Sequence, residues 1–399
     1  MRVLVVHNRY SSRVPSGENL AVDDEVRWLH DAGVDVIRHE VTNDEIVAPG
    51  PLARARDGID AVWSLPARRR FLAVLDDSRP DVVHLHNLFP LLTGSVPRAA
   101  RQRDVPVVWT VHNRRVRCVA GGYFRAATAC HECRPGWRVP GVVHRCYAGS
   151  ASASALVTAA SSLFRATAGR SHVTPIAISR DMADWLTTTG GFPPRRVRVK
   201  HNGVAGPTGA VPAPGGRRTF LFLGRLAAYK GVELMLDAWR RADVNAELRI
   251  AGDGDLAPEV AAAAAADPRI TWIGQVPADR VGEHIAAARA VLVPSVWDEP
   301  FGRTAAEALA HGRPVLTTGR GGLSEIVDDS CGWVTGTDPD RLAEALRAAS
   351  ADDGGVDRLA VAARARWSQR FSPEATTAAL LDIYDAAREV RPASGRSPR

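Results

Sequence analysis

Short apolar runs rich in β-branched residues alternate with amphipathic, helix-like stretches along the whole chain, and this alternation limits the fold more than any other feature. Near-continuous apolar runs are typical of parallel strands that are buried on both faces and joined by helices, so the pattern predicts an α/β protein. The expected strands are residues 3–6, 34–38, 81–85, 105–111, 174–178 and 197–200 in the first half, and 219–223, 247–250, 270–273, 290–293 and 314–316 in the second.

Residues 205–217 separate the two groups of strands, and seven of these thirteen residues are Gly or Pro. Such a segment cannot hold a helix or a central strand, so we interpret it as a linker between two domains, 1–204 and 218–372. A helix is expected at 373–390, followed by a disordered tail at 391–399. Doubly wound sheets bind ligands at the carboxyl ends of their strands, so we expect two facing Rossmann-like domains with a deep cleft between them that holds the active site.

Composition narrows the class of protein and identifies one unusual segment. The 399 residues are 45% apolar, enough for a core in each domain, and no run of about 20 strongly apolar residues predicts a membrane-spanning helix. The first residues lack the layout of a signal peptide, which indicates a cytoplasmic protein. The net charge of +7 is concentrated between Arg114 and Arg170, where nine arginines and one acid, Glu132, give +8. Such a segment attracts phosphates, anionic lipids or nucleic acid.

An insertion near 114–150 also contains four of the five cysteines, which are Cys118, Cys130, Cys133 and Cys146. A Cys-x-x-Cys pair flanked by two further cysteines has the ligand count of a structural tetrathiolate zinc site, with His131 and His144 as substitute ligands. Inert thiols are the alternative, because the outer spacings match no strict zinc-finger pattern. A zinc-dependent nucleic-acid binder is a second alternative, although two complete α/β domains and few interleaved aromatic residues argue against it.

The segment after residues 290–293, PSVWDEPFGRTAAEALAHGRPV, predicts a loop followed by a helix that begins near Gly302 and Arg303. Glu299 then lies in the loop and Glu307 in the helix. Amides at the start of a helix favour an anion such as a diphosphate, and a carboxylate beside them can accept hydrogen bonds from sugar hydroxyls.

The segment FLGRLAAYKG places Arg225 and Lys230 after the first strand of the second domain. Two cations there could clamp a nucleoside diphosphate and stabilise it as a leaving group. Lys230 is one of only two lysines in a chain that otherwise uses arginine. The string GDGDLA, which includes Gly252, also matches a dinucleotide-binding pattern, but its aspartates would face the pyrophosphate and no acid follows about 20 residues later. A hydride-transfer enzyme is therefore a weak alternative.

In the first half, polar residues again follow expected strands. His112 ends the strand of PVVWTVHNRR, and Gly17 and Glu18 open the first expected helix, where amides and a glycine permit close approach of a phosphate. We interpret the end of VVHLHN mainly as the end of a strand that could also contact an acceptor. Its polar residues are His84, His86 and Asn87.

Four segments of the second half are similar, in order and spacing, to the second domain of retaining bacterial glycosyltransferases of the GT-B fold and the family-four type. They are FLGRLAAYKGVELMLDAW, AGDGDL, EPFGRTAAEALAHGRPVL and TGRGGLSEIV. The first half resembles the acceptor domain of the same family, so the resemblance covers nearly the whole chain. One departure is the first loop, VPSGENLAV, which has only Gly17 where the family often has paired glycines.

The resemblance implies transfer of a sugar from a nucleoside diphosphate donor, with UDP as the expected nucleotide, to an acceptor with retention of anomeric configuration. It implies no catalytic metal, because Arg225, Lys230 and helix amides stabilise the departing diphosphate. Glu307 would accept hydrogen bonds from the ribose, while Glu299 and His112 would contact the donor sugar. The remaining residues expected at the donor are Gly17, Gly252, Phe301, Gly302 and Arg303. A nucleotide-sugar epimerase of the same architecture and a nucleotide binder without catalysis are the alternatives.

The charge of the basic segment exceeds what an uncharged sugar acceptor needs. We therefore expect an anionic acceptor, most simply a lipid-linked diphosphate at the inner membrane face, with peripheral membrane contact. Residues 147–164 lie in this segment but are too rich in Ala and Ser to span a bilayer. In the alternative interpretation the arginines are solvated or brace the cysteine loop.

Overall fold

The computed structural model describes residues 1–12, 16–45, 58–133, 137–170 and 173–389, so the expected tail at 391–399 lies outside the described residues. The chain divides into two compact units. The first contains Met1–Arg125, Cys130–Lys200 and Thr376–Arg399, and the second contains Ala126–Ala129 and His201–Ala375. Each has a six-stranded sheet. All strand pairs within the two sheets are parallel, which confirms the α/β class.

The sheet of the first unit has the order β2-β1-β3-β4-β7-β8. Its strands are β1 (Arg2–Arg9), β2 (Asp35–Thr42), β3 (Val82–Leu85), β4 (Val107–Val111), β7 (Thr174–Ala177) and β8 (Arg198–Val199). Its helices are α1 (Gly17–Asp31), α3 (Leu65–Ser78), α4 (Ser95–Gln102), α5 (Val139–Val143), α6 (Ala151–Arg170), α7 (Arg180–Trp185) and most of α15 (Pro373–Glu389). A short two-stranded ladder, β5 (Phe124–Arg125) with β6 (Thr128–Ala129), lies between β4 and α5 in the sequence.

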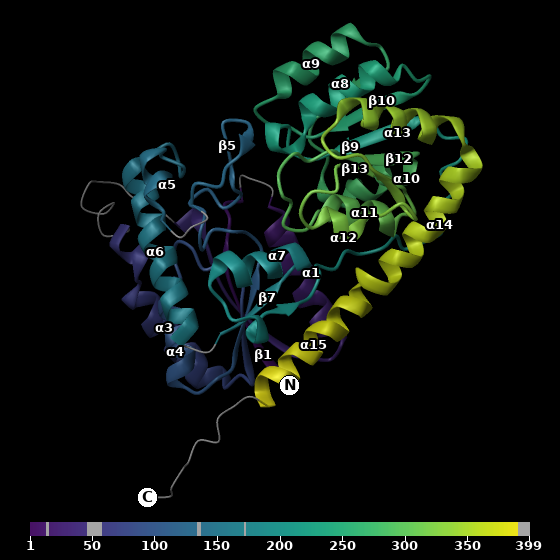
Figure 1. Cartoon of the computed structure of the whole chain (residues 1–399). Helices are drawn as coiled ribbons and strands as arrows, with labels where there is room; N and C mark the ends of the chain where they lie inside the picture. Colours follow the sequence, from purple (N-terminus) through teal and green to yellow (C-terminus); the bar gives the residue numbers. More distant parts are fainter. Residues whose placement is uncertain (13–15, 46–57, 134–136, 171–172, 390–399) are drawn as a thin grey trace, which may run out of the picture. The chain divides into compact units, whose positions relative to one another are not determined.

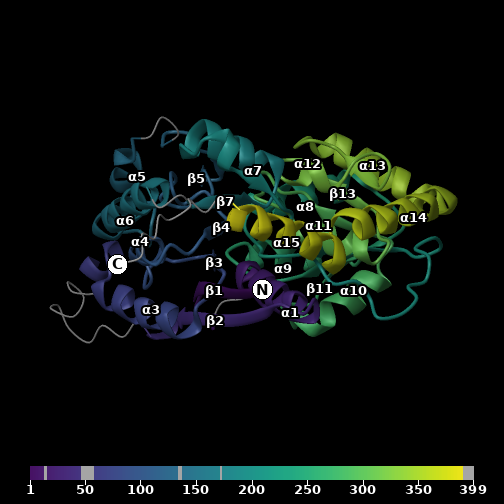
Figure 2. The ribbon, with the colours of Figure 1, turned by 90° about the horizontal axis from the view of Figure 1, so that it is seen from below.

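Helices cover both faces of this sheet. Figures 1 and 2 show α3, α4 and α6 on one side and α1, α7 and α15 on the other. Leu380, Ile383 and Tyr384 of α15 pack in one apolar cluster with Val3 and Val5 of β1. The C-terminal helix therefore completes the core of the first unit, a long-range contact that the sequence pattern does not predict.

The sheet of the second unit has the order β11-β10-β9-β12-β13-β14. Its strands are β9 (Thr219–Leu223), β10 (Glu247–Ala251), β11 (Ile270–Trp272), β12 (Ala290–Val293), β13 (Val315–Thr317) and β14 (Gly332–Val334). Its helices are α8 (Val232–Ala242), α9 (Ala257–Ala266), α10 (Val281–Ala287), α11 (Arg303–Ala310), α12 (Leu323–Ile326), α13 (Pro339–Ala351) and α14 (Asp353–Arg370). The main core cluster joins α8 and α13 to one face of this sheet, with Trp239 and Phe220 fully buried in it.

Each of the eleven expected strands has its counterpart, while β14 and the β5–β6 ladder were not expected. The two units divide between Lys200 and His201, ahead of the linker predicted at 205–217, and that linker contains neither helix nor strand. No helix within the described residues is both long and apolar enough to cross a membrane.

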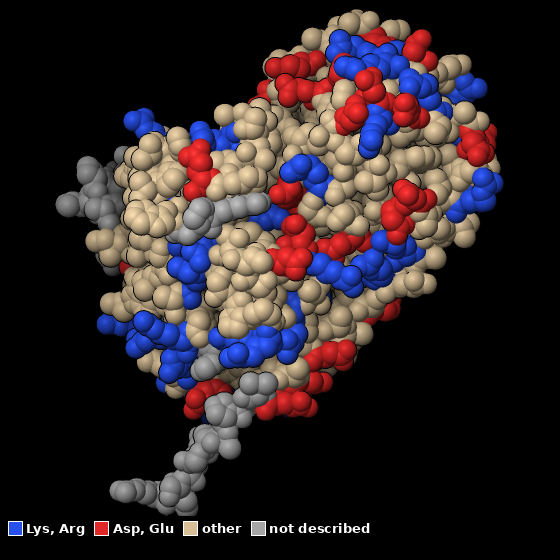
Figure 3. Space-filling view, viewed as in Figure 1, with Lys and Arg blue, Asp and Glu red and all other residues tan. Residues whose placement is uncertain are grey.

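Charged side chains of both signs are intermixed on the visible face of the second unit (Figure 3). The ion pairs of the second unit include Arg241, which contacts both Asp237 and Asp340 at 2.7 and 2.8 Å. Exposed pairs of this kind contribute little to stability, about 0 to 1 kcal/mol each. They do leave the second unit without a large field of one sign on this face.

Candidate active site

The strand order of the second unit reverses between β9 and β12, because the chain continues from β9 to one side of the sheet and from β12 to the other. In open α/β sheets ligands bind at such a switch point, beyond the carboxyl ends of the strands. The loop after β9 leads through a 3₁₀ turn, Ala228–Lys230, into α8, and the loop after β12 leads into α11. These two loops carry Arg225, Lys230 and Glu299.

The two loops are tied directly to each other. Lys230 Nζ donates to Glu299 Oε1, and the Ser295 hydroxyl donates to the same oxygen at 2.8 Å. The Glu299 side chain is only 6% exposed and that of Lys230 is 27% exposed. Burial alone would raise the pKa of Glu299, but the Lys230 charge and the hydrogen bonds from Lys230, Ser295 and Trp297 together lower this pKa below its ordinary value. The switch point therefore holds an ionised carboxylate and a partly exposed ammonium.

A glycine makes this close approach possible. Gly231 has φ +73°, and a Cβ atom there would lie 1.9 Å from the carbonyl oxygen of Pro294. Any other residue would push the β9 loop away from the β12 loop. Lys230 also lies 5.7 Å from the ring of Trp297, a cation–π distance that further restrains its stem.

Helix α11 begins at Arg303 after Gly302, whose φ of +111° reverses the chain. No side chain caps this helix start, and within its first turn Ala305 N donates to the Gly302 carbonyl at 3.0 Å. The positive end of the helix dipole lies here and favours an anion. Arg303 donates to Glu307 one turn later at 2.7 Å. Phe301 is buried and packs against Phe371 at a ring distance of 5.9 Å, so its side chain anchors the loop.

The backbone of the Glu299 loop is braced by the segment after β13. Gly322 N donates to the carbonyl of Glu299 at 2.7 Å, and Gly321 forms an isolated bridge with Glu299. A Cβ atom at Gly321 would lie 2.4 Å from that carbonyl oxygen. The glycine pair of TGRGGLSEIV thus lets a second loop pack directly on the one that carries the carboxylate.

Two further predicted donor residues lie in neighbouring loops. Gly252 follows β10 with φ +142°, and a Cβ there would lie 1.9 Å from the carbonyl of Gly224, so a glycine is required by packing alone. Arg225 is exposed and forms no ion pair with any described residue. The structure thus places Arg225, Gly252 and the Lys230–Glu299 pair after three adjacent strands of one sheet.

The first unit has its own switch point, between β1 and β3. The start of α1, the loop after β3, and the end of β4 with its loop line a cavity of about 80 Å³ that also contacts α6. Its polar lining includes four residues that the sequence placed at strand ends or at the first helix, which are Glu18, His86, Asn87 and His112. Asn113 and Arg115 also line it, and the sequence analysis did not single them out for this site. Apolar residues, including Phe89, Trp109 and Phe164, complete the lining.

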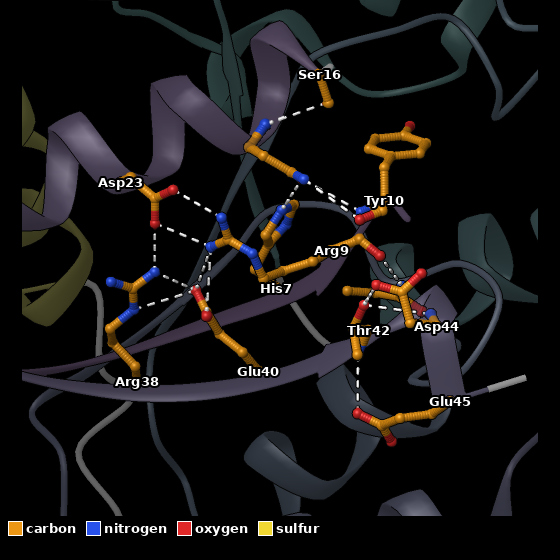
Figure 4. A network of polar contacts seen from close by, with 12 residues as sticks. His7, Arg9, Tyr10, Ser16, Asp23, Arg38, Glu40, Thr42, Asp44 and Glu45 are labelled. Carbon is orange, nitrogen blue, oxygen red and sulfur yellow. Dashed lines mark hydrogen bonds and ion pairs between the residues drawn. The ribbon is translucent and has the colours of Figure 1, made fainter. Parts of the chain in front are cut away.

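Gly17 opens α1, and the N-cap Ser16 accepts from Asn19 N at 3.3 Å. Figure 4 shows how the strands beneath this helix start are fixed. Arg9 of β1 contacts Asp23 of α1 at 2.7 Å, and Arg38 of β2 reaches the same carboxylate at 2.5 Å. Because one acid on α1 holds arginines from two strands, the helix start that carries Gly17 and Glu18 is locked to the sheet.

A buried network that the sequence did not predict lies behind His112. His86 Nδ1 lies 3.0 Å from His112 Nε2, and His86 Nε2 lies 3.3 Å from Glu25 Oε1. Glu25 also accepts from Lys200 Nζ, which is nearly fully buried. His84 Nδ1 lies 2.7 Å from the Tyr384 hydroxyl of α15.

Burial lowers the pKa of His86 to about 3 and that of His84 to about 4, so both rings are neutral at pH 7. Burial also holds the pKa of His112 well below its ordinary value. Burial would raise the pKa of Glu25, but Lys200, His84 and His86 together hold this pKa well below its usual range. The network therefore holds one ion pair and neutral imidazoles.

A proton on His86 Nε2 would face the Glu25 carboxylate, which lies 3.3 Å away. In that tautomer His86 Nδ1 would accept from His112 Nε2, and His112 Nδ1 would carry a lone pair. His84 in β3 and His86 directly after that strand are two residues apart, which places both on one face of an extended chain. This spacing was the one sequence signal that could have revealed the network.

Two family models match the chain. Residues 20–205 match the model described as Glycosyltransferase Family 4, and residues 217–352 match Glycosyl transferases group 1. The chain is 33% identical over 327 residues to a D-inositol 3-phosphate glycosyltransferase of Xylanimonas cellulosilytica, covering 78% of this chain and 73% of that protein. It is 28% identical over 421 residues to an α-maltose-1-phosphate synthase of Mycobacterium tuberculosis, covering 96% and 99%.

Among solved structures, the chain resembles Anabaena HepE in complex with UDP, with a TM-score of 0.68, 16% identity, and coverage of 97% of this chain and 100% of that one. A second HepE structure, in complex with UDP-glucose, gives a TM-score of 0.66. Two α/β units, each with a six-stranded parallel sheet, are the GT-B glycosyltransferase architecture. This chain belongs to the family-four type of glycosyltransferases.

Proposed function

We propose that the protein transfers a sugar from a nucleoside diphosphate donor to an acceptor with retention of anomeric configuration. The observation that carries this proposal is the Lys230–Glu299 pair beside the uncapped start of α11, all at the switch point of the second sheet. An ammonium and the positive end of a helix dipole suit a diphosphate, and a buried carboxylate suits sugar hydroxyls. UDP is the proposed nucleotide, in keeping with the UDP bound to the HepE structures.

In the proposed reaction Lys230, Arg225 and the first amides of α11 stabilise negative charge on the departing diphosphate. Glu307 accepts from the ribose, Glu299 orients the sugar ring, and His112 contacts the donor sugar through its unprotonated Nδ1. The acceptor attacks from the face that the diphosphate leaves, and a phosphate oxygen takes its proton. No side chain acts as a nucleophile in this scheme.

The test is a panel of nucleotide sugars scored first by thermal shift and then by release of the nucleoside diphosphate. A donor that binds only the native state raises the melting temperature. We expect a shift with at least one donor and diphosphate release only when an acceptor is present. A shift with no release under any acceptor would favour a binder, and a donor converted to its epimer without release would favour an epimerase.

We infer further that the acceptor is anionic, and three arginines of the basic segment support this. The guanidinium groups of Arg117 and Arg165 both lie close to Gly191. A Cβ atom at Gly191 would be 3.2 Å from a nitrogen of Arg117 and 3.4 Å from a nitrogen of Arg165. Arg138 is buried and donates to Ser161 at 2.5 Å. Burial, followed by Arg165 and Arg117, lowers the pKa of Arg138 to about 10.

Like charges held together repel, so this cluster favours a bound anion. Not every arginine of the segment is available for this role. Arg114 is buried against Asp181, and Arg125 contacts Glu132 at 2.5 Å, as the bracing interpretation predicts. The surface over α5 and α6 is also largely uncharged on the face shown in Figure 3.

Co-sedimentation with vesicles of phosphatidylglycerol and phosphatidylcholine tests the lipid-linked form of this acceptor. We expect binding at low salt that falls steeply as salt rises, and weaker binding by an Arg117→Gln/Arg165→Gln variant. The control is Arg240→Gln, an exposed arginine of the second unit paired with Asp237. No binding at low salt, together with transfer to a soluble neutral acceptor, would contradict both the membrane contact and the anionic acceptor.

A further inference from the structure

Four cysteines between residues 118 and 146 lie near one another in the first unit. Cys118, Cys130, Cys133 and Cys146 are all free thiols, so no disulfide links them. The four sulfurs are close enough to interact electrostatically. Burial is the main cause of the raised pKa of Cys133 and of Cys146, and neighbouring cysteines raise each pKa further. The segment that carries them contains only a two-residue ladder and the five-residue helix α5. Such a segment has little regular structure of its own to hold four thiols together.

Backbone contacts draw the four cysteines together in two pairs. Tyr123 N donates to Cys118 Sγ at 3.3 Å, and Cys130 N donates to the carbonyl of Tyr123 at 2.7 Å. Tyr123 thus joins the first two cysteines.

Gly141 joins the other two. The Gly141 backbone hydrogen-bonds the Cys133 thiol, and Cys146 N donates to the Gly141 carbonyl at 3.0 Å. A Cβ at Gly141 would lie 2.5 Å from Val119 and 3.6 Å from Cys133 Sγ, so a glycine is needed for this approach. Val119 follows Cys118 directly, which places the second pair against the first.

The two histidines near these thiols are less suitable as ligands. His144 Nε2 contacts Glu132 at 2.9 Å, and the His131 ring lies 6.5 Å from the Tyr123 ring at a tilt of 47°. Nearby guanidinium groups do suit thiolates, because Arg125 and Arg138 both interact with sulfurs of the cluster. The donor set is therefore four sulfurs in a basic surrounding.

We propose that Cys118, Cys130, Cys133 and Cys146 bind one structural zinc ion. Four thiolates satisfy tetrahedral zinc without an open position, so the ion would be structural. Within the described residues, only Glu25, His84 and His86 already have three ligand atoms within 4.8 Å of one another. Zinc binding would therefore pull the four sulfurs closer together by side-chain rotation.

The histidine and glutamate group is not a competing metal site. Glu25 already neutralises the buried Lys200, and both ring nitrogens of His84 have partners, the Tyr384 and Thr110 hydroxyls at 2.7 Å. A divalent ion there would lie beside an ammonium group. In the cysteine site, in contrast, all four proposed ligands are sulfurs.

Zinc content is measured by elemental analysis of the full chain purified without added metal. We expect about one zinc per chain, and release of that zinc when p-chloromercuribenzoate titrates the thiols, monitored with a zinc indicator. Absence of metal with four titratable thiols in the native protein would overturn the proposal. Stoichiometric iron in place of zinc would overturn it as well.

Matched variants separate this site from the fifth cysteine. Cys130→Ser and Cys133→Ser should each lose the zinc and lower the melting temperature, while Cys331→Ser, a buried thiol of the second unit, should retain the zinc. Full zinc content in both cluster variants would contradict the assignment. The wild-type titration keeps the test decisive if a variant fails to fold. Because the readout is metal content, it does not depend on the proposed transferase activity.

Discussion

His86 and His112 are stacked side by side in the first unit, with ring centroids 5.3 Å apart and 3.0 Å between His86 Nδ1 and His112 Nε2. His86 in turn contacts Glu25, the partner of Lys200. A cavity-lining residue, His112, is thus linked through His86 to a buried ion pair that does not line the cavity.

This relationship predicts that His86 is a positioning residue. In His86→Ala the acceptor for His112 Nε2–H is lost and water can enter, so the pKa of His112 should rise toward about 6.5. The acid limb of the kcat/KM profile should then move to higher pH. An equal loss of kcat/KM at every pH would indicate a packing role only.

Replacing one member of the buried Glu25–Lys200 ion pair should lower the stability of the protein. Glu25→Gln leaves a buried ammonium without its carboxylate, and we expect a loss of about 3 to 5 kcal/mol in the free energy of unfolding. Glu25→Gln/Lys200→Met should recover much of that loss in urea unfolding. If the double variant is as unstable as the sum of the two single variants, the residues are not coupled.

Lys230→Ala should reduce turnover by about two orders of magnitude, the scale for losing one charge-stabilising donor. It also leaves Glu299 buried without its cation, so the melting temperature should fall. Lys230→Ala/Glu299→Gln should restore the melting temperature but not turnover. Arg240→Ala, at an exposed ion pair, is the control. Full activity in Lys230→Ala would remove Lys230 from the mechanism.

The two carboxylates of the second unit should give different kinetic signatures. Glu307→Ala should mainly raise KM for the donor, whereas Glu299→Ala should mainly lower kcat. Steady-state kinetics with a saturating acceptor measure both. Indistinguishable signatures would mean that the roles of Glu299 and Glu307 are assigned wrongly.

Glu18 should make stability fall as pH rises. Burial raises its pKa to about 7, although Arg115 opposes the shift, while its pKa in the unfolded chain is about 4.3. Between about pH 4.3 and 7 the folded state binds the extra proton, so ionisation costs stability progressively over this window. In thermal melts, the melting temperature of Glu18→Gln should change less with pH over this window than that of the wild type. An unchanged slope would show that Glu18 ionises freely.

The sequence predicted the strands well because buried parallel strands are continuous apolar runs, as in β1 and β9. It missed β14, because this strand has only the three residues Gly332–Val334, which form no such run. The loops with Lys230 and Glu299 were predicted because residues that follow neighbouring parallel strands meet at one edge. Tyr384 could not be assigned to His84 from the pattern, because 300 residues separate them. The pairing of Lys230 with Glu299 also depends on glycine-permitted loop contact, which strand periodicity does not contain.

The most direct test of the central claim is the anomeric configuration of the first product, measured by proton NMR early in the reaction with an α-linked nucleoside diphosphate sugar identified in the donor panel. The account predicts release of one nucleoside diphosphate per sugar transferred and an α-linked product. A β-linked product would contradict retention, and no transfer from any donor in the panel would contradict the proposed glycosyl transfer itself.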